Sequence, residues 1–218
     1  MRYVKMGTAA LCVTMALSIF MVCDCWAGLR IDKPKVRLTI APGAYEAGEI
    51  KVENTSKEPL NVRVYLEDWV YLAPDGGKTF KPKGTEKLSC SNWITFYPAD
   101  MTLQAGANQM VRFTVSVPKD AVGGHYSVMF FETGSGDATM QDEEGNDVLV
   151  KILNRLGALF YVEPAGTIQK TAQLENLVIT HNRNDLTVSG VFSNTGNADI
   201  VTQGTFNVLD ADGYVYAR

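Results

Sequence analysis

The chain has 218 residues, of which 46% are apolar and 20% are charged, and its formal net charge at pH 7 is −4. This composition excludes an intrinsically disordered protein, and the length allows one or two domains with a hydrophobic core. The mildly acidic chain has no basic stripe, so we expect no nucleic-acid partner.

The first 27 residues have the features of a secretory signal peptide. Arg2 and Lys5 precede an apolar run over 6–23, and the residues Cys25 and Ala27 fit a cleavage site after Ala27. An uncleaved anchor is the alternative, because the run approaches the ~20 residues that span a bilayer. We therefore expect a periplasmic or extracellular protein whose only contact with a membrane is through this segment.

Cysteine usage agrees with a fold that needs no disulfide. Three of the four cysteines lie in the signal segment, and only Cys90 remains after it. A single cysteine forms no internal disulfide, whatever the redox state of the compartment.

From residue 31 onward, apolar and polar residues alternate with the period of two that is typical of β-strands. The predicted strands are 31–40, 48–54, 60–71, three within 93–132, and 148–162. The polar segments 72–90 and 133–147 are predicted to be a hairpin or loop excursion and a loop. About seven strands without a helical period predict an all-β fold, an immunoglobulin-like β-sandwich over 28–164.

The clearest strand precedes Pro118, which ends it because proline has no amide to donate to a sheet. Met110 and Arg112 belong to the exposed face of this strand, and the apolar residues alternate with them. The residues expected in the core are Val111, Phe113, Val115 and Val117.

A domain boundary is predicted at 163–166, E-P-A-G. Beyond it, 174–180, 186–193, 202–209 and 214–217 read as four further strands separated by polar turns. A second sandwich usually takes ~100 residues, whereas 165–218 is much shorter. We therefore expect an incomplete second immunoglobulin-like domain there, either from a truncated chain or as a functional half-domain.

The order and spacing of several short motifs resemble the PapD-like periplasmic pilus chaperones and related bacterial immunoglobulin-like surface domains. The resemblance covers 29 to about 164. It is carried by an aromatic strand at 93–97, Pro98, Leu103, Gly106, Q-M-V-R-F at 109–113, Val117-Pro118, Gly124-x-Tyr126 and L-F-Y at 159–161.

The resemblance implies that the last strand of the first domain binds a pilus subunit by donor-strand complementation. In the family, a basic residue on the first strand and a lysine on the last strand hold the subunit's terminal carboxylate. The first strand offers the basic residues Lys35 and Arg37, of which Arg37 is the candidate carboxylate anchor, whereas Ala158 stands at the lysine position.

The strand over 148–162 is apolar on both faces in its first half, and only one face can point into the domain's own core. Leu149, Lys151 and Leu153 are therefore the candidate subunit-binding residues, with cover by the second domain or by the 133–147 loop as the alternative.

No grouping of residues indicates catalysis, a metal site, a cofactor or a small-molecule substrate. His125 and His181 are far apart and lack ligand-like neighbours, so we expect solvated or hydrogen-bonded side chains. The acidic cluster in 137–147 lacks the spacing of a calcium loop.

We expect a protein partner and no enzyme. The leading hypothesis is a chaperone-like binder of pilus or surface-protein subunits, and the alternative is a structural or adhesive surface module without chaperone activity.

Overall fold

The computed structural model describes residues 28–72, 76–142, 144–182, 185–205, 207–210 and 212–217. The expected signal peptide, 1–27, lies outside these residues. The regular secondary structure of the described residues consists of β-strands and one short 3-10 turn, η2 (Ser91–Trp93), before β6. The all-β prediction is therefore confirmed.

The first part of the chain contains the strands β1 (Leu29–Ile31), β2 (Lys35–Ile40), β3 (Tyr45–Asn54), β4 (Leu60–Leu72), β5 (Gly77–Pro82), β6 (Ile94–Tyr97), β7 (Asp100–Leu103), β8 (Asn108–Ser116), β9 (His125–Gln141) and β10 (Asp147–Pro164). The second part contains β11 (Ala172–Asn182), β12 (Asp185–Asn194), β13 (Val208–Leu209) and β14 (Val215–Ala217).

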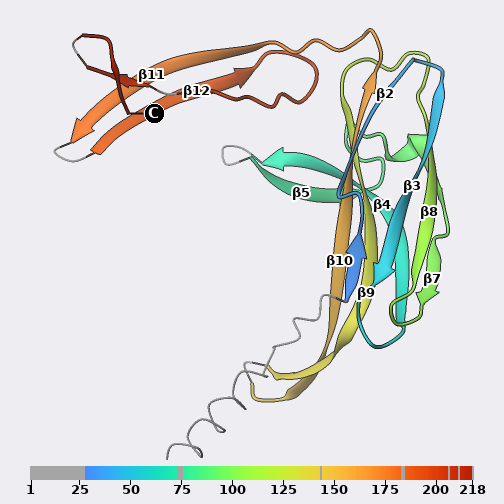
Figure 1. Cartoon of the computed structure of the whole chain (residues 1–218). Helices are drawn as coiled ribbons and strands as arrows, with labels where there is room; N and C mark the ends of the chain where they lie inside the picture. Colours follow the sequence, from blue (N-terminus) through green and yellow to red (C-terminus); the bar gives the residue numbers. More distant parts are fainter. Residues whose placement is uncertain are drawn as a thin grey trace, which may run out of the picture.

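Strands β1 to β10 form two sheets that pack face to face, as the immunoglobulin-like sandwich predicted (Figure 1). One sheet has the order β1-β3-β8-β6, and the other has the order β2-β10-β9-β4-β5, with β7 also paired to β4. The pairs within both sheets are antiparallel except β2 and β10, which run parallel. This parallel pair closes one end of the second sheet.

The single strand predicted at 31–40 is in fact two strands, one in each sheet. β1 pairs with β3, and β2 pairs with β10. The break falls at 32–34, where Pro34 has no amide to continue a ladder. The chain therefore crosses from one sheet to the other at this proline.

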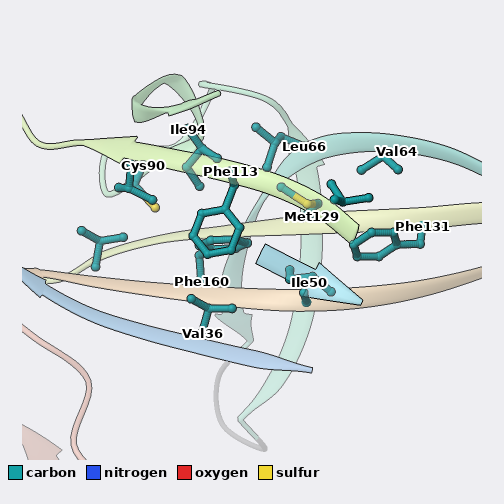
Figure 2. Packing of buried hydrophobic residues seen from close by; sticks show 14 of the residues in the cluster. Val36, Ile50, Val64, Leu66, Cys90, Ile94, Phe113, Met129, Phe131 and Phe160 are labelled. Atoms are coloured by element: carbon teal, nitrogen blue, oxygen red, sulfur yellow. The ribbon is translucent and has the colours of Figure 1, made fainter. Parts of the chain in front are cut away.

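The core lies between the two sheets, and the alternation predicted for β8 is confirmed. Val111, Phe113 and Val115 are buried, whereas Arg112 on the opposite face is exposed. Figure 2 shows Phe113 above Phe160 of the facing sheet, and their ring centroids are 5.0 Å apart in an edge-to-face arrangement.

The loop predicted at 133–147 is wrong, because β9 continues through most of it to Gln141 and pairs with β10 along the way. Backbone hydrogen bonds to a strongly β-forming partner strand do not require apolar side chains, so polar residues are accommodated there. The resulting β9–β10 hairpin runs past the rest of the sandwich, at the end opposite to β11 and β12 (Figure 1).

Beyond β10 the chain forms two small antiparallel sheets. β11 pairs with β12, and β13 pairs with β14. The strands predicted at 174–180 and 186–193 are confirmed by β11 and β12, whereas the strand predicted at 202–209 is limited to Val208–Leu209. The side chains of β11 and β12 are almost all exposed, so this hairpin has no core of its own among the described residues.

Candidate functional site

One side of β10 carries no neighbouring strand over its first half. β9 pairs with β10 from Asp147 to Val162, but on the other side β2 pairs only from Leu159 onward. In the described part of the chain, no strand is paired to that side of residues 147–153. We call this side of residues 147–153 the open edge.

The direction of the backbone amides along the open edge follows from the β2 pairing. The amide of Leu159 donates to the carbonyl of Pro34, on the β2 side. Amides point to alternate sides along a strand, so those of Leu149, Lys151 and Leu153 point to this same side. The backbone amides of these three residues therefore face the open edge.

The predicted subunit-binding residues lie on this segment. Leu149 is 63% exposed and Leu153 is 58% exposed, with the exposed Lys151 between them on the same face. Val148 and Ile152, on the opposite face, are also exposed.

The prediction that one face of this segment would point into the domain's core is therefore wrong. The segment lies in the part of the hairpin that extends past the sandwich. The region 133–147 does not cover it either, because β9 lies beside β10 in the same sheet.

The sandwich core begins where the open edge ends. Leu156 packs against the core, and Ala158 is fully buried in it. Alternate residues of a strand face opposite sides of the sheet, so the position that the resemblance aligns with an anchoring lysine faces inward here. A cation at position 158 would point into the apolar core. Any cation on the outer face of the sheet must therefore come from another position.

A groove of ≈ 470 Å³ lies beside the end of the open edge. Its lining includes Leu29 and Leu60 as well as Asn154, Arg155 and Leu156 of β10. The groove offers room for a side chain of a strand that follows the open edge toward the sandwich.

Arg37, the candidate carboxylate anchor, lies on β2 directly opposite Tyr161 of β10. Its guanidinium donates two hydrogen bonds to the Asp199 carboxylate, Nη2 to Oδ2 at 2.7 Å and Nη1 to Oδ1 at 3.3 Å. The hydrogen bond to Asp199 raises the pKa of Arg37 and outweighs partial burial, which lowers it. The structure thus supplies the Arg37 guanidinium with a carboxylate from the same chain.

The ring of Tyr161 forms the floor beneath Arg37 and a second cation. The Arg37 guanidinium carbon lies 4.2 Å from the ring centroid, and Lys35 Nζ lies 4.5 Å from it. Burial, together with a hydrogen bond involving Tyr71, raises the pKa of Tyr161. Lys35 has no carboxylate partner among the described residues. The sequence had offered both Lys35 and Arg37 as basic residues of the first strand, and their spacing of two residues places both on one face.

An aromatic cluster continues along this outer face of the sheet. Trp69 is buried against Tyr126 and Tyr161, and its indole N–H donates to the carbonyl of Ser127 at 2.9 Å. With its N–H satisfied and its ring covered, Trp69 is a packing residue. The cluster fixes the position of the Tyr161 ring and therefore of the cations above it.

His125 differs from its predicted environment. Both ring nitrogens are buried without a hydrogen-bond partner, and the ring packs against Trp93 with centroids 4.2 Å apart. Burial lowers the pKa of His125, which favours the neutral ring. The prediction that the His125 imidazole is solvated or hydrogen-bonded is therefore wrong among the described residues.

A buried carboxylate on strand β4, beside the aromatic cluster, has a structural role. Asp68 is buried and accepts hydrogen bonds from the Ser89 hydroxyl and the Glu86 amide, which hold the segment after β5 against β4. Burial alone would raise the pKa of Asp68, but these hydrogen bonds lower it below its usual value. No group of three metal-ligating side chains occurs in the parts of the chain that the structure covers.

Among the described residues, no helix has the length and apolar character needed to cross a membrane.

No protein-family model matches the chain, and no curated protein matches it. Similar solved structures include the class 5 fimbriae chaperone CfaA, with 19% identity over 78% of this chain and 67% of that chain and a TM-score of 0.44. Another is the CsuC–CsuE chaperone–tip adhesion subunit complex of Acinetobacter baumannii, with 13% identity over 80% and 91% of the two chains and a TM-score of 0.42.

A PapD-like domain of human CEP192 is also similar, with 12% identity over 63% of this chain and 84% of that chain and a TM-score of 0.37. PapD-like fimbrial chaperones are therefore among the structural neighbours of this chain, and the likeness concerns the fold alone.

Proposed function

We propose that the protein is a secreted, chaperone-like binding protein that holds a pilus or surface-protein subunit by β-strand pairing. The open edge of β10 carries this proposal, since it combines backbone donors with exposed apolar side chains on both faces. An unpaired strand edge is a template for a strand of another chain, whose side chains then meet those of the edge.

The side chains of the open edge favour a partner that buries them. Burying a leucine that is otherwise exposed stabilises a complex by about 1.5–3 kcal/mol before the costs of association. Leu149 and Leu153 would fill apolar positions of the partner, with Lys151 between them directed to its rim. Backbone pairing then supplies affinity that is independent of the partner's sequence, and the leucines supply selectivity.

The proposal includes export and a division of the chain into two units. Arg2, Lys5 and the apolar run after them support export to the periplasm or cell surface with removal of 1–27. The end of β10 at Pro164 and the positive φ of Gly166, 79°, support a boundary between 28–164 and 165–218. The partner is a protein, and binding, not catalysis, is the proposed activity.

A pair of double variants tests which surface holds the partner. Leu149→Ser with Leu153→Ser should abolish co-purification with co-expressed exported subunits from the same cell. The matched control is Leu174→Ser with Leu177→Ser on β11, two leucines with similar exposures of 64% and 59%. Loss of capture in the first variant only, with circular dichroism unchanged, supports strand pairing. Unchanged capture would eliminate it and favour a structural or adhesive module that binds through loops.

A second experiment separates backbone pairing from side-chain contact. Lys151→Pro removes an amide that points to the open edge and leaves the pairing with β9 intact, because edge strands tolerate a proline whose missing amide faces outward. Lys151→Ala removes the same side chain and keeps the amide. Capture should be lost with proline and retained with alanine. Equal capture by both variants would contradict pairing along this edge.

A further inference from the structure

The Arg37–Asp199 pair joins two parts of the chain that are 162 residues apart. The Asp199 side chain is 8% exposed and the Arg37 side chain is 38% exposed. Both terminal nitrogens of the guanidinium donate to the one carboxylate, which is the fork geometry in which arginine recognises carboxylates. While Asp199 is bound, no second carboxylate can take both of these hydrogen bonds.

The segment that carries Asp199 is docked closely on the first sandwich. The Asp199 amide donates to the Tyr126 hydroxyl at 2.8 Å, and the Gly124 amide donates to the Asn197 carbonyl at 2.8 Å. Ala198 is buried against Gly124, where an added Cβ would lie 3.2 Å from Ala198 and 2.6 Å from the Tyr126 hydroxyl oxygen. The close packing of residues 197–199 on Gly124 and Tyr126 thus holds the Asp199 carboxylate against Arg37.

The other charges around Arg37 are also partly matched. Glu163 lies 3.7 Å from Arg37 Nη1 and is itself bound by Lys170 at 2.8 Å. Lys35 lies over the same Tyr161 ring without a carboxylate partner among the described residues. If Asp199 left, two cations would remain above Tyr161, which is the charge arrangement that attracts another carboxylate.

We propose that Asp199 is an internal carboxylate that closes the Arg37 site, so that a carboxylate of a bound partner must displace it to reach Arg37. This inference rests on the proposed strand pairing, because the partner is the chain that would bring the carboxylate. A strand that followed the open edge and continued to Leu156 would end five residues before Tyr161, about 17 Å at ~3.3 Å per residue. Five further residues of extended partner chain span that distance.

Closure of the Arg37 site by Asp199 determines which contacts hold a partner. In the closed state, Arg37 contributes nothing to a partner's carboxylate, and affinity comes from the open edge. Displacement of Asp199 also removes one of the contacts that dock residues 197–199 on the first sandwich, so a partner carboxylate on Arg37 and the Arg37–Asp199 pair exclude each other.

The first test uses acetate as the probe and the full exported chain. In the wild type, the NMR signal of Arg37 Nε should not respond to acetate, whereas in Asp199→Asn it should shift saturably. Asp210→Asn is the matched control, because Asp210 is exposed and accepts only local amide hydrogen bonds from Asp212 and Tyr214. It should behave as the wild type. A wild-type response equal to that of Asp199→Asn, or no response in either protein, would overturn the proposal.

The second test uses an extended peptide of alternating valine and threonine, with either a free C-terminal carboxylate or an amide. The wild type should bind both forms equally. Asp199→Asn should bind the acid about tenfold more tightly than the amide, the size of one charge-assisted interaction, and adding Arg37→Gln should remove this preference. Equal binding of acid and amide by Asp199→Asn contradicts the inference. Failure of every protein to bind either peptide would count against the proposed function and would leave the acetate result as the decisive test of the closed site.

Discussion

Phe113→Ala is expected to lower the free energy of unfolding by about 3–5 kcal/mol, the range for truncating a buried phenylalanine. Phe113 is 4% exposed, and its ring packs edge-to-face on Phe160 and directly over Gly48, where an added Cβ would lie 2.5 Å from the ring. The backbone of Gly48 and the ring of Phe160 can move little to fill the cavity that the substitution leaves. We therefore expect a loss of unfolding free energy in the upper part of that range. For a chain of this size, about 4 kcal/mol corresponds to a fall in Tm of roughly 8–16 °C.

Urea unfolding of the full chain, followed by circular dichroism, gives the free energy and the m-value together. The control is Arg112→Ala, one residue away on the exposed face of β8, which should cost less than ~0.5 kcal/mol. Phe160→Ala and the double variant complete a cycle, and the coupling between the two rings should be about 0.5–1.5 kcal/mol. A loss below ~1 kcal/mol for Phe113→Ala at an unchanged m-value, or an equal loss for Arg112→Ala, would refute the assignment of Phe113 to the core.

Three further predictions concern the same chain. Burial lowers the pKa of His125, so the unfolded chain binds this proton at higher pH, and part of the stability should be lost as pH falls below ~6.5. His125→Phe should flatten that loss, whereas an equal slope in His125→Phe and in the exposed control His181→Phe would argue against it. Burial, with the charge of Asp68, raises the pKa of Cys90, so peptide mass spectrometry should find Cys90 unlabelled by maleimide in native protein and fully labelled in urea. A fragment of residues 28–164 should show the β-sheet circular dichroism and cooperative unfolding of the sandwich, and an unfolded fragment beside a folded full chain would contradict the proposed division.

The parts of the fold that could be predicted are those in which the alternation of side chains agrees with residues that end a strand, such as proline. On β8, buried Val111 and Phe113 alternate with exposed Arg112, and Pro118 follows directly, so both the face and the end of the strand were readable. The split between β1 and β2 also had a signal, Pro34, which the single strand predicted over 31–40 did not take into account.

The parts that could not be predicted depend on pairing between distant segments. The polar second half of β9 is a strand because β10 supplies its hydrogen-bond partners, and no property of its own side chains indicates this. The Asp199 carboxylate meets Arg37 although 162 residues separate them in the sequence, which no local spacing encodes. Leu149, Lys151 and Leu153 could be selected from alternation alone. That neither face of their segment enters the core follows from the length of the hairpin, which only the structure gives.

The two edges of the β2-β10-β9-β4-β5 sheet differ in how well they are protected against pairing with another chain. Exposed edge strands are usually protected by charged residues, proline or short length, because an unprotected edge invites pairing with other chains. The edge strand β5 has six residues and carries Lys78, Lys81 and Pro82, which is such protection. The open edge of β10 carries a single cation, Lys151, within an otherwise apolar run over 148–153. Protection is present on one edge of the sheet and nearly absent on the other, and this difference supports the proposal that a partner strand covers the open edge.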